Sequence, residues 1–171
     1  TSKAVAFIDG EMRRDYDNLI RYKVNLKRKN IGYIQYHYLY TRSFFRDTPV
    51  PKSCIEAFNY WKGQGAKYWP GEGPYARGLA AIALHRFGDA KPAREIMESL
   101  RENAIYHDEM GMYWKENVGG YWWYQAPLET QSLLIEAFSE VAKDRRAVDD
   151  MRTWLVKMKQ VQHWGTTKAT T

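Results

Sequence analysis

Three consecutive polar residues, His107, Asp108 and Glu109, are the closest that this sequence comes to a set of metal ligands. Adjacent loop residues rarely ligate one ion together, so a solvated run of charges is the simpler interpretation. Four histidines and one cysteine also cannot supply a cysteine-rich zinc site. His37 and His85 fall in predicted helices, where a hydrogen-bonded side chain is the more common role. We therefore predict no metal-binding residue.

Acidic residues offer a second kind of chemistry. Glu72, Glu129 and Glu136 are candidates for a carboxylate pair of the glycosidase type. Glu129 also has a simpler role, because a carboxylate in the first turn of a helix stabilises the positive end of the helix dipole. The sequence contains no phosphate-binding loop, no dinucleotide fingerprint, no His-Glu-x-x-His and no Gly-x-Ser-x-Gly. We therefore assign no catalytic residue and no cofactor-binding residue.

Aromatic side chains make up 15% of the chain, including seven Trp and thirteen Tyr. Two interpretations remain open at this point. Large rings fill the core of any fold, whereas exposed rings stack on sugars or bases. The loop at residues 112–124 holds Trp114, Trp122 and Trp123 and is where a sugar-binding platform would lie. A long loop of this kind is typically functional or packed over a core.

The overall composition restricts the class of protein. Hydrophobic residues are 44% and charged residues 27% of the 171 positions, as expected for one globular domain. The net charge of +6 permits an acidic partner. The basic cluster at residues 21–29 alternates with apolar residues and has no nucleic-acid-binding motif beside it, so we predict no nucleic-acid partner. The longest apolar run, residues 79–84, is far shorter than the roughly 20 residues of a membrane span.

Helices are expected to position all of these side chains, since the apolar residues recur at helical spacing. Three segments are apolar around most of the helix, which indicates burial: residues 33–46, 74–87 and 127–141. Four segments have a single apolar face, which indicates partial exposure: residues 11–29, 52–62, 89–106 and 144–162. The sequence therefore predicts an all-α fold.

Turns and loops separate these helices. Asp9-Gly10 predicts a turn before the first helix, and residues 63–73 predict a loop rich in Gly and Pro. Within the loop at residues 107–125, we expect residues 112–115 and 121–124 to form a short β-hairpin around Gly119-Gly120.

The helices recur as pairs. Residues 79–84 align with residues 133–138 at an offset of about 54 positions, and residues 40–47 resemble residues 83–89 more weakly. A single pair cannot bury both sides of its apolar helix. Pairs placed side by side, with apolar helices inside and amphipathic helices outside, solve this problem. The pattern predicts a partial α/α toroid of antiparallel helix pairs.

We predict a single domain over residues 1–171, excised from a larger α/α toroid. Its parts are a leading helix, three helix pairs and the start of a further helix. They cover residues 1–32, then 33–64, 74–106 and 126–162, and finally 163–171.

The C-terminal part of the chain resembles a known family. Residues 148–160, which contain a Trp-Leu pair, are followed by Trp-Gly-Thr-Thr-Lys-Ala-Thr at residues 164–170. In this order the segments resemble the thioester-type α/α toroid domain of the alpha-2-macroglobulin family, in its large bacterial members. Residues 75–81 and 127–138 are similar to starts of inner helices in that domain. The resemblance covers residues 33–171.

This resemblance implies a broad-spectrum peptidase inhibitor that works as a protease trap. A protease cuts a bait segment elsewhere in the molecule, which then changes shape and encloses the protease. Members with an internal thioester also capture the protease covalently, through a Cys joined to a Gln three residues later. Cys54 is followed at that position by Ala57, so the bond cannot form here. A buried helix thiol is the simpler interpretation of Cys54.

The resemblance implies a structural module that is not an enzyme and needs no cofactor. The implied partners are target proteases, reached through the full-length parent, and other domains of the same chain. The implied location is the periplasm or cell surface of a bacterium, and a lipid anchor on the parent is expected. The alternative is a carbohydrate-active α/α toroid enzyme, a glycosidase or polysaccharide lyase with an aromatic cleft. A third possibility is a helical scaffold that binds protein partners on a concave face.

Overall fold

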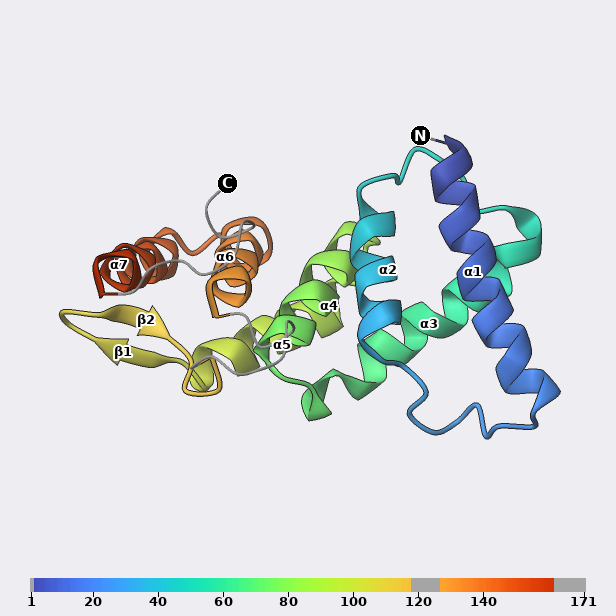
Figure 1. Cartoon of the computed structure of the whole chain (residues 1–171), viewed down its shortest axis with the longest axis horizontal. Helices are drawn as coiled ribbons and strands as arrows, with labels where there is room; N and C mark the ends of the chain where they lie inside the picture. The colour runs from blue at the N-terminus through green and yellow to red at the C-terminus, as the bar shows by residue number, and fades with distance from the viewer. Residues whose placement is uncertain (1, 118–126, 162–171) are drawn as a thin grey trace.

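The computed structural model describes residues 2–117 and 127–161, and over these ranges the fold is mostly helical, as the sequence predicted (Figure 1). A two-stranded sheet lies between the fifth and sixth helices in the chain. The helices are α1 (Ser2–Arg21), α2 (Tyr33–Ser43), α3 (Ile55–Tyr68), α4 (Pro74–Arg86), α5 (Ala90–Glu102), α6 (Pro127–Ala137) and α7 (Arg145–Val161).

The buried helices lie next to one another. Helix α4 packs between α2 and α6 (Figure 1). Residues 79–84 within it are fully enclosed. The amphipathic helices cover this row: α1 and α3 contact α2, α5 contacts α4, and α7 contacts α6. Buried and amphipathic helices therefore alternate along the chain, as the repeat predicted.

Proline and glycine set the ends of the buried helices. Pro74 and Pro127 are the first residues of α4 and α6, where a missing N–H is tolerated. Gly88 follows α4 with a φ of +87°, and the N–H of Asp89 donates to the carbonyl oxygen of Leu84 at 2.9 Å. The left-handed glycine thus ends the helix at the predicted position.

The predicted turn at Asp9-Gly10 is wrong, because α1 continues through both residues. Asp9 is enclosed and forms an ion pair with Arg42 of α2, while Gly10 faces solvent. The buried face of α1 recurs at helical spacing as Val5, Asp9, Met12 and Tyr16. The contact with α2 therefore overrides the local turn preference of the Asp-Gly pair.

Helix α3 is longer than predicted and runs through the first half of the expected loop at residues 63–73. Gly65 is buried, and a Cβ at this position would lie 3.3 Å from the Leu39 side chain. The Gln64 side chain donates to the carbonyl oxygens of Leu26 and Arg28, at 3.3 and 3.0 Å. Gly65 thus lets α3 approach α2 closely, and Gln64 ties α3 to the segment before α2.

A β-hairpin forms in the region after α5, but with a different strand from the one expected. Strands β1 (Ile105–His107) and β2 (Gly111–Tyr113) pair antiparallel, with Tyr106 opposite Met112. The sequence had assigned residues 105–106 to the end of a helix. The expected second strand, residues 121–124, lies outside the described residues.

Aromatic side chains fill much of the core. Trp61, Trp114, Tyr36 and Phe138 are among the largest fully buried side chains. The indole N–H of Trp61 donates to the carbonyl oxygen of Met12 at 3.0 Å, and that of Trp114 to Leu100 at 2.8 Å. For these residues the core interpretation of the aromatic content is confirmed. Within the described ranges, no helix has both the length and the apolar character needed to cross a membrane.

Candidate functional site

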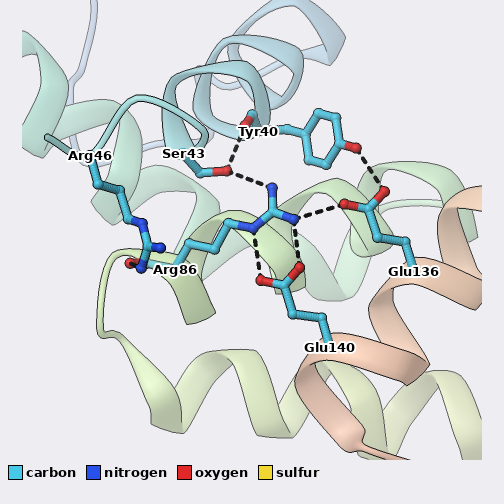
Figure 2. Close-up of polar contacts among 6 residues, drawn as sticks. All are labelled: Tyr40, Ser43, Arg46, Arg86, Glu136 and Glu140. Carbon is cyan, nitrogen blue, oxygen red and sulfur yellow. Dashed lines mark hydrogen bonds and ion pairs between the residues drawn. The ribbon is translucent and has the colours of Figure 1, made fainter. Parts of the chain in front are cut away.

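One of the predicted candidate carboxylates, Glu136, lies in a polar cluster where the three buried helices meet (Figure 2). Its centre is Arg86, the last residue of α4. We call it the Arg86 cluster, and its members are Tyr40, Ser43, Arg46, Arg86, Glu136 and Glu140. Glu140 belongs to a π-helical segment, Phe138–Ala142, that continues α6. The cluster therefore connects side chains from α2, α4 and the α6 region.

The guanidinium of Arg86 donates to both carboxylates (Figure 2). Its Nε donates to Oε1 of Glu140 at 2.8 Å and its Nη2 to Oε2 of Glu140 at 2.5 Å. The same Nη2 donates to Oε1 of Glu136 at 2.8 Å, and Nη1 donates to Oγ of Ser43 at 3.2 Å. The Arg86–Glu140 contact is bidentate, which is the strongest form of this pair.

Residues of α2 and the turn after it complete the cluster. The Tyr40 hydroxyl donates to Oε2 of Glu136 at 2.8 Å, and the Ser43 hydroxyl donates to the Tyr40 carbonyl oxygen at 2.6 Å. The Phe44 ring centroid lies 4.2 Å from Cζ of Arg86, so the guanidinium also makes a cation–π contact. Each of the three guanidinium nitrogens thus donates at least one hydrogen bond to another side chain of the protein.

The charges of this cluster fix the protonation of its members. Hydrogen bonds from Arg86 lower the pKa of Glu140 below its ordinary value. Burial raises the pKa of Tyr40, and its hydrogen bond to Glu136 raises it further. At neutral pH Glu140 is therefore ionised and Tyr40 is a neutral phenol that donates a hydrogen bond.

This arrangement does not fit the chemistry of a glycosidase pair. In such a pair both carboxyl groups face the substrate, and one of the two is protonated so that it can act as the general acid. Here Arg86 binds Glu136 and Glu140 together and holds Glu140 ionised. The Arg86 side chain is 11% exposed, so substrate has little access to the charge between them. The cluster instead ties three helices together.

The other two candidate carboxylates lie in different surroundings. Glu72 forms an ion pair with Lys29 at 2.5 Å, between the turn after α3 and the segment before α2. Glu129 lies close enough to Tyr75 to raise its pKa, although burial of that ring is the larger cause. Glu72 therefore has an ion pair of its own, and Glu129 acts electrostatically on Tyr75.

Two of the histidines, His107 and His37, also have structural contacts. The Nδ1 of His107 accepts the N–H groups of Glu109 and Met110 at 3.2 and 3.3 Å, which closes the turn between β1 and β2. The His37 ring centroid lies 5.4 Å from that of Tyr75. In the parts of the chain that the structure describes, no group of three His, Cys, Asp or Glu residues is placed to hold a metal ion.

The aromatic loop is only partly described. Trp114 is 1% exposed and packs against Phe138, with ring centroids 5.9 Å apart. It therefore cannot stack on a sugar in this arrangement. Trp122 and Trp123, the other rings of the predicted platform, lie outside the described residues.

A second buried ionic contact joins α1 to α2. Nε of Arg42 lies 3.1 Å from Oδ1 of Asp9, and the two side chains are 2% and 1% exposed. The Tyr38 hydroxyl donates to the same Asp9 oxygen at 2.7 Å, and Nη2 of Arg42 donates to the Thr48 carbonyl oxygen at 2.6 Å. Nη1 of Arg42 also donates to the Phe45 carbonyl oxygen at 2.5 Å, so each guanidinium nitrogen has an acceptor, as a buried charge requires.

Sequence reasoning found Glu136 but missed Arg86, its central partner. The repeat contained the signal, because the offset of 54 positions that aligns residues 79–84 with 133–138 also aligns Arg86 with Glu140. Aligning Tyr40 with Ala83, as the weaker repeat does, places Ser43 opposite Arg86. Equivalent positions of neighbouring helices lie side by side, so opposite charges at such positions predict a contact.

Comparisons with known proteins identify no relative. A scan against protein-family models gives no match, and searches of curated proteins and of solved structures also give none. The function therefore has to be argued from the residues and the geometry.

Proposed function

We propose that this chain is a non-enzymatic structural module of an alpha-2-macroglobulin-like protease trap, and that it forms part of the α/α toroid of that protein. The observation that carries the proposal is the alternation of helices. Helices α2, α4 and α6 pack in sequence, and an amphipathic helix covers each of them. Continued in both directions, this arrangement would generate a curved double wall of the kind such toroids have.

The Arg86 cluster supports a structural role for the chain. Its ion pairs join α4 to the α6 region, and the Ser43 hydroxyl links α2 to the same guanidinium, which stiffens the row of buried helices. A module that transmits a shape change after bait cleavage needs helices that move together. The sugar-enzyme alternative has less support, because Trp114 is buried and Glu136 is bound to Arg86.

The remaining parts of the proposal follow from the resemblance of residues 33–171 to the alpha-2-macroglobulin family. The parent protein would be exported to the periplasm or cell surface of a bacterium and held there by a lipid anchor. Its partners would be target proteases and its own other domains. A thioester, if the parent has one, would lie outside this chain, because Ala57 occupies the position after Cys54 that the bond requires.

A protease-protection assay on the full-length parent tests this function. The parent is incubated with an endopeptidase such as trypsin, in one series with the protease in molar excess over the parent and in another with the parent in excess. Residual protease activity is then measured on two substrates. We expect cleavage of the parent at a single segment, with loss of activity on a large protein substrate. Activity on a small chromogenic peptide should remain, because an enclosed protease still admits small molecules.

Two controls make the result specific. Protease inactivated at its nucleophile should leave the parent uncleaved and unchanged in electrophoretic mobility. A conventional active-site inhibitor should abolish activity on both substrates. Equal activity on the large substrate with and without the parent would contradict the trap, and so would equal inhibition of both substrates.

A further inference from the structure

A groove runs between α1 and α2, and one of its lining residues, His37, also packs against Tyr75 of α4. Its volume is about 440 Å³. Both helices contribute four side chains to its lining, which are Ile8, Glu11, Met12 and Asp15 from α1 and Ile34, His37, Tyr38 and Thr41 from α2. The helices run in opposite directions, since Asp9 meets Arg42 while Asp15 meets Gln35. The groove is therefore elongated along both helix axes.

The groove offers apolar surface that the described residues leave open. Met12 and Tyr38 are buried at its floor, whereas Ile34 at its wall is 64% exposed. A large aliphatic side chain exposed at the wall of a concave surface is typical of a contact site.

The internal repeat indicates what shape of partner belongs there. Helix α4 has a buried-type neighbour on each side, α2 and α6, and it also contacts the amphipathic helix α5. Helix α2 contacts α4 and also borders the groove, with the amphipathic helix α1 as the second wall. The groove thus lies beside α2, as α2 itself lies beside α4. A helix is the element that fits this place.

The charge of the groove indicates the composition of that helix. Glu11 and Asp15 lie one turn apart on α1, and the lining contains no lysine or arginine. Arg14 pairs with Glu11 from outside the lining, and the Gln35 amide donates to Asp15 at 3.1 Å, so both carboxylates are held at the rim. An apolar stripe would cover Met12 and Ile34, and cationic side chains beside it would meet the two carboxylates.

We propose that the α1–α2 groove binds an amphipathic helix whose apolar stripe is flanked by lysine or arginine. The binding mode is that of a helix in a groove, with anchors at positions i, i+3, i+4 and i+7. If the proposed function holds, this helix belongs to a neighbouring segment of the same protease-trap polypeptide. The docking itself rests only on the groove, its charge and the repeat.

Two synthetic peptides test the proposal on the 171-residue chain. Each has about 18 residues, enough for a helix that forms on binding, with Leu and Ala in one stripe. The first peptide carries lysine at the flanking positions, and the second carries glutamate there. We expect fluorescence anisotropy to give at least about tenfold tighter binding of the lysine peptide, with the preference weakening at high salt.

Three variants locate the site. Ile34→Asp should weaken binding of the lysine peptide at least about tenfold, because it places a charge on the apolar wall. The double change Glu11→Lys and Asp15→Lys should reverse the preference in favour of the glutamate peptide. Val156→Asp replaces an apolar side chain on α7 that is similarly exposed, so it should leave binding unchanged. Circular dichroism verifies that each variant is folded.

The possible results separate this proposal from its competitors. No binding of either peptide, equal binding of both, or the same loss in Val156→Asp as in Ile34→Asp would overturn it. Concentration-dependent dimerisation that Ile34→Asp abolishes would show that the groove takes a second copy of the chain instead, which also overturns it. Peptide binding together with a negative protease-protection assay would leave the groove intact and remove only the trap function.

Discussion

Arg86 places a full positive charge where its side chain is only 11% exposed. Four hydrogen bonds to the side chains of Ser43, Glu136 and Glu140 hold the guanidinium there. These partners belong to α2 and to the α6 region, so a single residue of α4 links both neighbouring helices. The energetic importance of the residue follows from this, because removing it leaves two carboxylates facing each other.

We expect Arg86→Met to lower the free energy of unfolding by about 2–4 kcal/mol, since one partner of a largely enclosed charge network is lost. The two carboxylates are 33% and 34% exposed, which keeps the loss below that of a fully buried pair. Urea unfolding measures the change. The matched control is Arg13→Met, which breaks an exposed pair with Asp17 and should cost at most about 0.5 kcal/mol. Equal effects of both variants would contradict the role of Arg86.

The pH dependence of stability gives a second test at the same residue pair. The pKa of Glu140 is lower in the folded chain than in the unfolded chain, where the pKa of a glutamate is about 4.3. Its stabilising contribution is therefore complete above the unfolded pKa and is lost as the pH falls through the folded pKa. We expect the stability difference between wild type and Glu140→Gln to be constant above about pH 5 and to shrink in acid. A difference that grows on acidification would contradict the ion pair.

At the scale of elements, the hairpin is held against α7 at a point of close approach. Gly111 has a φ of +79°, and a Cβ there would overlap the carbonyl oxygen of Asp150. Gly88, after α4, has a similar φ of +87° but no atom near its Cβ position. The two glycines therefore separate the cost of a left-handed backbone from the cost of a steric overlap.

We expect Gly88→Ala to cost about 1–2 kcal/mol, the penalty of the left-handed conformation alone. Gly111→Ala should cost at least about 1 kcal/mol more, because β2 must move away from α7 to admit the methyl group. Thermal unfolding followed by circular dichroism compares the two variants. The packing of β2 on α7 would be contradicted if both substitutions lowered the melting temperature equally.

The sequence predicted those elements whose ends carry local signals. Pro74, Pro127 and Gly88 mark helix ends through their own backbone chemistry: α4 and α6 begin at the two prolines, and Gly88 lies two residues after the end of α4. Asp9 and Gly65 were assigned to turns because such residues favour turns when isolated. In the fold Asp9 pairs with Arg42 and Gly65 packs near Leu39. Contacts between segments far apart in the sequence determine the helical conformation of Asp9 and Gly65, and local residue preferences contain no information about such contacts.

The candidate site was predictable only in part, for the same reason. Glu136 was found because it is an acidic residue on a buried helix, but its role depended on Arg86, 50 positions earlier. The 54-position repeat aligned Arg86 with Glu140 and so contained the contact, whereas motif searches did not. The contribution of Trp114 to the core could not be separated in advance from sugar binding, since both uses favour the same residue type.

At the scale of the whole molecule, the proposed protease-trap function and the proposed helix-binding groove both depend on one arrangement. Helices α2, α4 and α6 must form an inner row that amphipathic helices cover (Figure 1). In such an arrangement the inner helices open only when the whole structure unfolds, while the outer helices also open locally.

Amide hydrogen exchange of the 171-residue chain, read by mass spectrometry, measures this order of opening most directly. Residues 79–84 and 133–138, which lie on α4 and on α6 with its π-helical continuation, should exchange slowest and at a common rate. Helix α1 and the exposed ends of α7 should exchange faster. If α1 were protected more strongly than residues 79–84, or if residues 79–84 exchanged as an unfolded chain does, the inner row would not exist.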